Sequence, residues 1–248
     1  MIKRCACVVL LATCLTALAD QVRVGVAANF AAPMKTLAAG FERASGHRAL
    51  LSIAATGTLH AQVVNGAPFD VLLAADEDTP LKLEQAQLGV AGTRSSYAIG
   101  KLVLWSARPG MVDAAGEVLQ QGRFAYLALA NPSLAPYGAA AVQTMTRLGV
   151  LEKLRPRLVQ GQSIGQTYSF IATGNAELGF IALSQVFANG AFTSGSGWIV
   201  PAALYHPLRQ DAILLRRAQD KPAARALLAY LVSAPARAII RSFGYALP

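Results

Sequence analysis

The sequence predicts an α/β protein of two lobes, each with a mostly parallel sheet flanked by helices. Two observations lead to this prediction. Strand-to-helix units follow one another from residue 22 to residue 89, and the same unit recurs from residue 124 onward. Such repeats favour parallel strands joined by right-handed crossovers. The pattern changes at Tyr97, where a strand to Trp105 has no helix directly after it, and this strand with the irregular stretch that follows is expected to lead into the second lobe.

The first series begins with valine at positions 22, 24 and 26, an alternation that predicts a strand running directly into a helix near Asn29. Gly46 is expected to end that helix, because glycine readily adopts the left-handed conformation of a C-cap. Thr56-Gly57 is expected to begin the next helix, and the third is expected to run from Asp78 to Gly89. The later strands of this series are predicted at residues 49–55 and 69–75.

The second series has less regular spacing. Helices are expected to begin at Tyr137-Gly138 and at Ser163-Ile164, and two further helices are expected to close the chain, the last beginning at Ser233. Residues 192–197, rich in Ser and Gly, are predicted to form a loop. The predicted strands are residues 97–105, 124–130, 178–183 and 211–215.

The N-terminus has the pattern of a secretory signal peptide. Lys3 and Arg4 precede an apolar run, and the small-x-small sequence that ends at Ala19 predicts cleavage there, so that the mature chain begins near Asp20. All three cysteines lie in this leader, so the mature chain is expected to have no disulfide and no cysteine ligand or nucleophile. Lipidation at Cys14 remains open, because the residues before it have the outline of a lipoprotein box.

Composition excludes several classes of protein. With 54% hydrophobic and 14% charged residues, the chain is not disordered. The formal net charge is +9, but the basic residues are scattered and lack interleaved aromatic residues, so a solvated basic surface is expected and no nucleic-acid partner. The long uncharged stretches are broken by Pro, Asn, Gly and Ser and are not expected to span a membrane.

Four strand-to-helix turns form the candidate site. If the two lobes face each other, the carboxyl ends of their strands bring four helix N-termini to one crevice, where unpaired N–H groups and helix dipoles favour an anion. The donors are uncharged, so the ligand is expected to be a small anion that only accepts hydrogen bonds. A lone Asn29 could instead be a simple N-cap. The turns lie at Asn29, Thr56-Gly57, Tyr137-Gly138 and Ser163-Ile164.

An enzyme is the alternative from a different class. Residues 161–165 spell G-x-S-x-G, the pattern of a nucleophile elbow, and Glu177 and His206 follow Ser163 in the order of a hydrolase triad. The strand before this turn is very short, and the sequence has no oxyanion motif of the HGGG type. An exported serine hydrolase using Ser163 is therefore the weaker hypothesis, and the chain is expected not to be an enzyme.

Several motifs resemble the periplasmic molybdate-binding proteins of bacterial ABC importers. They are Val-Ala-Ala-Asn-Phe at 26–30, Ala-Thr-Gly-Thr-Leu at 55–59, the run Asn-Gly-Ala-Pro-Phe-Asp-Val-Leu-Leu-Ala-Ala-Asp at 65–76, Ala-Asn-Pro and Ala-Pro-Tyr-Gly within 130–138, Glu-Leu-Gly-Phe-Ile-Ala-Leu-Ser-Gln at 177–185, and Arg-Ser-Phe-Gly-Tyr at 241–245. They occur in the family's order along essentially the whole mature chain.

The resemblance implies a type II periplasmic binding protein with its ligand cleft between two lobes. The expected lobes are residues 20–98 with 209–248, and residues 99–208. The implied ligand is molybdate, with tungstate, and sulfate or another tetrahedral oxyanion is the alternative. No cofactor is implied, and molybdenum is bound only as the oxyanion. The implied partner is a membrane permease, and the protein is expected to be a periplasmic monomer.

By motif, the resemblance assigns the ligand to five residues: Asn29, Thr56, Gly57, Tyr137 and Ile164. Tyr137 and Ile164 occupy positions that donate backbone N–H groups. Where some members have a Tyr whose hydroxyl reaches the anion, this chain has Ala182, which cannot donate. The hydroxyl of Tyr137 is expected to supply that donor instead.

Overall fold

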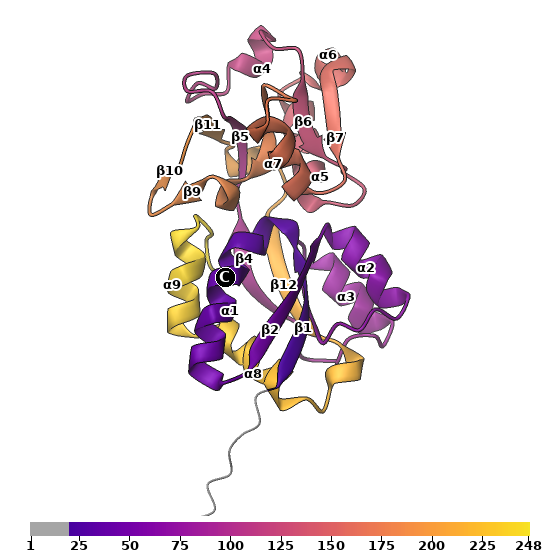
Figure 1. The fold of residues 1–248 in the computed structure, drawn as a ribbon. Coiled ribbons are helices and arrows are strands. Elements are labelled where there is room, and N and C mark those ends of the chain that lie inside the picture. Colours follow the sequence, from indigo (N-terminus) through magenta and orange to yellow (C-terminus); the bar gives the residue numbers. More distant parts are fainter. Residues whose placement is uncertain (1–19) are drawn as a thin grey trace, which may run out of the picture.

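The computed structural model describes residues 20–248 as two α/β lobes, one above the other in Figure 1. The predicted leader, with its cleavage site and Cys14, lies outside the described residues. Each lobe has its own five-stranded sheet, in the order β2-β1-β3-β12-β4 in the first lobe and β11-β5-β8-β6-β7 in the second. The α/β class predicted from the repeated units is confirmed.

The first sheet is parallel on one side and antiparallel on the other. β1 (Gln21–Ala27) pairs in parallel with β2 (Arg48–Ala54) and β3 (Val71–Leu73), whereas β12 (Leu208–Leu214) lies antiparallel between β3 and β4 (Ser95–Gly100). Its helices are α1 (Ala31–Ser45), α2 (Thr56–Val64), α3 (Asp78–Gln85), α8 (Pro222–Leu231) and α9 (Ala234–Ser242).

Two separate apolar clusters hold these helices against the sheet. Helices α1, α8 and α9 pack on one face, where Val22, Val24 and Val26 of β1 point. Helices α2 and α3 pack on the other face against Leu72 and Ile213. Both helical layers bury their apolar side chains almost completely, which fixes the direction in which each helix N-terminus points.

The second sheet is built the same way. β6 (Leu127–Ala130) pairs in parallel with β7 (Leu158–Gly161) and β8 (Leu178–Ala182), while β5 (Leu102–Ser106) pairs antiparallel with β8 and β11 (Ser196–Ile199). Its helices are α4 (Val118–Gln121), α5 (Pro136–Arg147), α6 (Leu151–Leu154) and α7 (Ile164–Ala172), and β9 (Phe187–Ala188) and β10 (Ala191–Phe192) form a hairpin.

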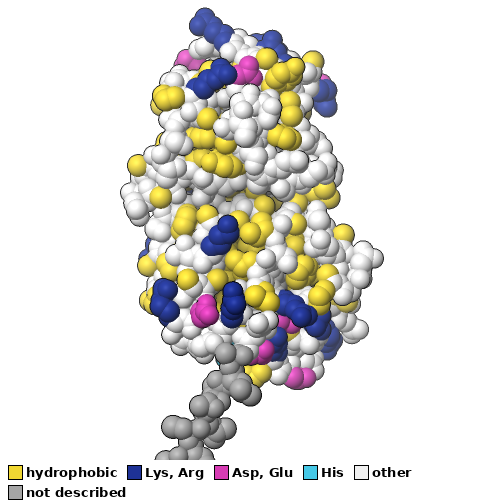
Figure 2. All heavy atoms as spheres, viewed as in Figure 1, with side chains coloured by type: hydrophobic (Ala, Val, Ile, Leu, Met, Phe, Trp, Pro, Cys, Tyr) yellow, Lys and Arg dark blue, Asp and Glu magenta, His cyan; other side chains and the backbone are white. Residues whose placement is uncertain are grey.

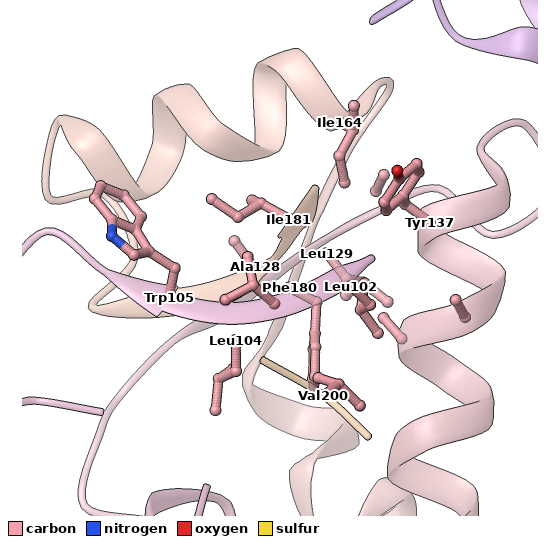
Figure 3. Close-up of a cluster of buried hydrophobic side chains, with 14 of the residues drawn as sticks. Leu102, Leu104, Trp105, Ala128, Leu129, Tyr137, Ile164, Phe180, Ile181 and Val200 are labelled. Carbon is pink, nitrogen blue, oxygen red and sulfur yellow. The ribbon is translucent and has the colours of Figure 1, made fainter. Parts of the chain in front are cut away.

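A single apolar core supports this second lobe. Figure 3 shows Trp105, Phe180 and Ile181 within it, with Tyr137 and Ile164 at the N-terminal ends of α5 and α7. Short 3-10 turns complete the secondary structure: η1 (Ala28–Phe30), η2 (Arg155–Arg157), η3 (Leu183–Gln185), η4 (Ala202–Leu204) and η5 (Arg216–Ala218).

The chain crosses between the lobes twice. It passes from the first sheet to the second at Lys101, between β4 and β5, and returns between β11 and β12. The expected boundary after residue 98 therefore falls inside β4, and the one after residue 208 falls at the start of β12. The last residues of the chain lie against β4, where Ala246 and Ile99 exchange backbone hydrogen bonds of 2.8 and 3.0 Å.

Three predicted boundaries are wrong in detail. The single strand expected at residues 97–105 is two strands in different sheets, β4 and β5. Gly89 does not end α3, which stops at Gln85; Gly89 is a glycine because a Cβ there would overlap the side chain of Ile213. The loop expected at residues 192–197 contains the end of β10 and the start of β11. Gly46 caps α1 with a φ of 73°, as predicted.

On the surface, Lys and Arg side chains are spread over both lobes on the face shown in Figure 2, without one continuous patch. Within residues 20–248 no single helix is both long and apolar enough to cross a membrane. The bent pair α8 and α9 reaches that length and composition only jointly, and both helices pack on the first sheet.

Candidate functional site

Four helix N-termini from the two lobes meet around one small cavity. The turns after β1 and β2 come from the first lobe, and the starts of α5 and α7 come from the second. The cavity is small and is lined by Ala27, Ala28, Asn29, Ala55, Thr56, Ala75, Ala135, Pro136, Tyr137 and Ile164. No charged side chain is among these lining residues. The fold thus brings together four residues that are far apart in the sequence: Asn29, Thr56, Tyr137 and Ile164.

Local sequence explains why each helix begins at the cavity. Ala55 and Ala135 are extended, with ψ of 150° and 118°, and the helices start at the next residue. Pro136 occupies the first position of α5, where its missing N–H removes no helical hydrogen bond. Ser163 caps α7 by accepting from the N–H of Gln166 at 3.2 Å.

The backbone N–H groups of these first turns are free to donate. The first N–H groups of a helix have no partner within it. Among the described residues, the N–H groups of Asn29, Thr56, Tyr137 and Ile164 donate to no backbone or side-chain acceptor outside their own helices. The positive ends of the helix dipoles point the same way, so the cavity favours a negative charge without containing a cation.

Thr56 adds a hydroxyl donor. Its side chain is buried, with 2% of the residue exposed, and Oγ1 accepts the backbone N–H of Ala75 at 3.0 Å. The hydroxyl proton is donated to no described residue, and both Thr56 and Ala75 line the cavity. Because Ala75 N–H occupies a lone pair of Oγ1, the free proton of this hydroxyl is available for the cavity.

Gly57 lies beside the cavity and does not line it. Its N–H donates across the lobes to the carbonyl of Leu134 at 2.9 Å, so it is not available to an anion in this arrangement. Gly57 and Leu134 belong to a larger neighbouring cleft that also holds Asp76, Glu77 and Asp78. Burial raises the pKa of Asp76, although hydrogen bonds from Thr79 partly offset this.

Asn29 turns its amide away from the expected role. The residue lines the cavity, but Nδ2 donates to Gln210 Oε1 at 2.9 Å and to the Tyr245 hydroxyl at 3.0 Å. Its backbone carbonyl accepts from the hydroxyls of Ser184 at 2.8 Å and Tyr245 at 2.9 Å. Asn29 is therefore not an N-cap, since Ala27 and Phe30 hold those positions for η1 and α1. It joins a buried network that links the two lobes.

Tyr137 belongs to the same network. Its residue is 1% exposed, and its hydroxyl accepts from Gln210 Nε2 at 3.1 Å. Gln210 Oε1 also accepts from the Tyr97 hydroxyl at 3.1 Å. Burial raises the pKa of Tyr137 well above its ordinary value, so its phenol stays protonated. Tyr137 lines the cavity, whereas Ala182 does not.

Gln210, Tyr245, Ser184 and Tyr97 were not predicted as site residues. A Gln inside an apolar strand and a Tyr in the C-terminal motif are weak signals on their own. In the fold both are buried, and burial of an uncharged polar side chain requires hydrogen-bond partners. Every buried polar side-chain atom within residues 20–248 has such a partner.

The residues of the hydrolase hypothesis do not form a triad. Ser163 is the N-cap of α7, and the carboxylate of Glu177 accepts the N–H groups of Ala125 and Tyr126 at 3.1 and 2.9 Å. His206 lines the neighbouring cleft, which includes neither Ser163 nor Glu177. Within the described residues there is also no group of three or more His, Cys, Asp or Glu placed to hold a metal ion.

Comparison with known proteins gives one consistent result. Residues 22–246 match the family model of the bacterial extracellular solute-binding proteins. The chain is 54% identical to the molybdate-binding protein ModA of Azotobacter vinelandii over 92% of this chain and 91% of the relative. It is 46% identical to ModA of Rhodobacter capsulatus over 93% and 90% of the two chains.

A solved structure agrees with these relatives. The periplasmic molybdate-binding protein of Azotobacter vinelandii superposes with a TM-score of 0.89 at 41% identity, over 92% of this chain and 99% of that one. These relatives are binding proteins, which agrees with the expectation that the chain is not an enzyme. The chain belongs to the family of bacterial extracellular solute-binding proteins that includes the ModA proteins.

Proposed function

We propose that this protein captures molybdate, and tungstate with it, in the cavity between its lobes and delivers the anion to the membrane permease of an ABC importer. The observation that carries the proposal is the cavity itself, where four helix N-termini converge and no charged side chain is present. A fully deprotonated tetrahedral dianion needs only hydrogen-bond donors, and this cavity supplies them. The names of the relatives at 54% and 46% identity support the same ligand.

We assign the donors as the backbone N–H groups of Asn29, Thr56, Tyr137 and Ile164 and the hydroxyl of Thr56. Hydrogen bonds to a charged group each contribute roughly 1.5 to 3 kcal/mol. Five of them sum to roughly 7.5 to 15 kcal/mol, a range that includes the roughly 8 kcal/mol of micromolar binding. Gly57 acts by joining the lobes through Leu134, not by touching the anion.

Binding of this kind requires closure of the lobes, because three of the donors come from the first lobe and two from the second. The hydrogen bond from Gly57 N–H to Leu134, at 2.9 Å, joins α2 to the turn before α5. The buried network around Asn29 also joins the lobes, through Ser184 and Tyr137. A closed protein with its anion sealed inside presents one defined shape to a permease.

Calorimetric titration of the mature, dialysed protein with molybdate, tungstate, sulfate and phosphate at equal ionic strength tests this function. Tight one-to-one binding of molybdate and tungstate alone is expected. Phosphate often carries a proton, for which the cavity offers no charged acceptor. Tight binding of sulfate in preference to molybdate would favour the alternative receptor, and absence of heat with all four anions would refute an oxyanion receptor.

The site of action is proposed from the leader and the family together. The chain is exported by the leader of residues 1–19, cleaved near Ala19, and acts as a periplasmic monomer without a nucleic-acid partner. N-terminal sequencing of the protein recovered from the periplasm, with its mass in solution, tests both statements. A mature N-terminus at Cys14 would show lipidation instead.

A further inference from the structure

The network around Asn29 has a direction, since each bond has one donor and one acceptor. From the first lobe come Asn29, Tyr97, Gln210 and Tyr245, and from the second come Tyr137 and Ser184. In the structure, Asn29 Nδ2 donates both of its protons to the network, one to Gln210 Oε1 and one to the Tyr245 hydroxyl, and none to the cavity. Below, the amide is called inward when Nδ2 faces the network and outward when Nδ2 faces the cavity. Asn29 Oδ1 receives no hydrogen bond from any residue between 20 and 248, although Asn29 lines the cavity.

This orientation of the Asn29 amide is unfavourable for an oxyanion in the cavity. Its carboxamide has one end that only donates and one that only accepts. With Nδ2 turned inward, the end left for the cavity is Oδ1, and two oxygen acceptors repel each other. An anion beside Asn29 is stabilised only if the amide turns so that Nδ2 faces the cavity.

Gln210 connects this choice to Tyr137. If Asn29 turns Nδ2 outward, its Oδ1 takes the inward position and needs a donor from Gln210, so Gln210 must place Nε2 there. Gln210 Oε1 then faces the Tyr137 hydroxyl, which must give its proton to Gln210. If instead the Tyr137 hydroxyl donates to the anion, its oxygen must accept from Gln210 Nε2, which is the 3.1 Å hydrogen bond seen in the structure. Gln210 Oε1 then faces Asn29, and Asn29 keeps Nδ2 turned toward the network. The Asn29 amide and the Tyr137 hydroxyl therefore cannot both donate to the anion.

Reversal of the network keeps every bond of Gln210, and its cost is confined to Tyr245, whose single proton moves from the Asn29 carbonyl, 2.9 Å away, to Asn29 Oδ1. After both amides turn, Gln210 Nε2 donates to Asn29 Oδ1 and to the Tyr97 oxygen, while the Tyr97 proton stays on the carbonyl of Ala74, 2.9 Å away. The Tyr245 hydroxyl donates to Asn29 Oδ1, and the Ser184 hydroxyl keeps its bond to the Asn29 carbonyl. The link between the lobes through Gln210 and Tyr137 persists with donor and acceptor exchanged.

We propose that Gln210 is the positioning residue that sets this direction, and that in the anion-bound protein it donates to Asn29 Oδ1 and accepts from Tyr137. Asn29 Nδ2 is then turned into the cavity and Tyr137 meets the anion through its backbone N–H alone. The bound direction offers the anion the two N–H protons of Asn29, whereas the opposite direction offers one proton from Tyr137. An acceptor-only ligand therefore favours the former.

Nuclear magnetic resonance of the isotope-labelled protein tests the direction of Gln210. With saturating molybdate, the side-chain NH₂ protons of Gln210 are expected to show their strong nuclear Overhauser effects to the ring of Tyr97, and the NH₂ protons of Asn29 are expected to lose theirs to Tyr245. Effects from Gln210 NH₂ that remain on the Tyr137 ring in the molybdate complex would overturn the proposal.

Two variants support the measurement. Gln210→Met removes the Gln210 signals, which assigns them, and it is expected to lower molybdate affinity about tenfold because Asn29 is no longer held outward. Ser184→Ala is the matched control: it removes a bond of the same network that is not on the path from Asn29 to Tyr137. This variant is expected to lose stability but to keep the molybdate-dependent change at Gln210; loss of that change would assign the effect to general loosening and contradict the role of Gln210.

Because this role requires the anion binding proposed above, calorimetry with molybdate comes first. Absence of binding would refute the proposed function. Binding without reversal at Gln210 would refute only the positioning role.

Discussion

The backbone N–H of Gly57 donates to the carbonyl of Leu134 across the cleft at 2.9 Å, and it does so because residue 57 has no side chain. A Cβ at this position would lie 3.1 Å from Leu134 Cα and 3.2 Å from its carbonyl oxygen, closer than most real Cβ contacts. The second residue of α7, Gly165, is the counterpart in the other lobe. A Cβ there would lie in ordinary contact, 3.7 Å from Ala28 Cβ.

Gly57→Ala is therefore expected to hinder closure and to weaken molybdate binding about tenfold, at the lower end of the cost of overpacking. Gly165→Ala is the matched control, since it adds the same methyl group at the same position of a facing helix, and it is expected to weaken binding less. Titration calorimetry of both variants measures the difference. Equal losses in the two variants would show that the close approach of Gly57 to Leu134 has no special part in binding.

Thr56→Val is expected to weaken molybdate binding roughly 10- to 100-fold, because the hydroxyl that donates into the cavity is lost and the Ala75 N–H loses its acceptor. Thr56→Ser keeps the hydroxyl and is expected to retain most of the affinity. Affinities of both variants, measured by calorimetry, separate the hydroxyl from the methyl group. If serine is as poor as valine, packing rather than donation explains the role of Thr56.

Ser163→Ala is expected to remove the N-cap of α7, at a cost of about 1 kcal/mol of unfolding free energy, and to keep tight molybdate binding, because the donor there is the backbone N–H of Ile164. Ser233→Ala removes the equivalent N-cap of α9, whose residues do not line the cavity, and is the control for stability. Thermal unfolding and calorimetry measure the two effects. A hydrolytic activity that is present in the parent protein and absent from Ser163→Ala would revive the enzyme hypothesis.

Alkaline pH is expected to destabilise the network. Burial raises the pKa of Tyr245 to about 12, and burial also raises the pKa values of Tyr97 and Tyr137. The unfolded chain loses these protons near pH 10, so stability is fully present below that pH and is lost as pH rises toward 12. For Tyr245 alone the shift corresponds to roughly 2 to 3 kcal/mol.

Urea unfolding at a series of pH values from 8 to 11.5 measures this loss. Tyr245→Phe is expected to be less stable than the parent at pH 8, because Asn29 and Ser184 lose a partner, but to fall less steeply above pH 10. Parallel curves for the two proteins would mean that Tyr245 does not titrate as described.

Much of the site could be predicted because its signals are local. Each of the four turns is a strand end followed by helix-start residues, and the structure places Asn29, Thr56, Tyr137 and Ile164 around one cavity. Gly46 was recognisable because a left-handed residue after a helix favours glycine.

The rest depends on contacts between distant residues. Asn29 meets Gln210 and Tyr245 across separations of 181 and 216 residues, and no periodicity reveals such pairs. The sequence does not reveal the division of residues 97–105 into two strands, because both halves are extended and apolar and only their pairing with different sheets separates them. The use of Gly57 N–H by Leu134 likewise follows from how the lobes meet.

The place of β12 inside the first sheet determines the order in which the two lobes can fold. β12 lies between β3 and β4, so the sheet that begins at residue 21 is incomplete until residues 208–214 are available. The second sheet uses only the continuous segment from residue 102 to residue 199. When the chain emerges with its N-terminus first, the second lobe is therefore the first that can finish folding. The polar network behind the ligand pocket, which includes Gln210 and Tyr245, is completed last. A chain truncated near its end is therefore expected to carry an intact second lobe without a working receptor.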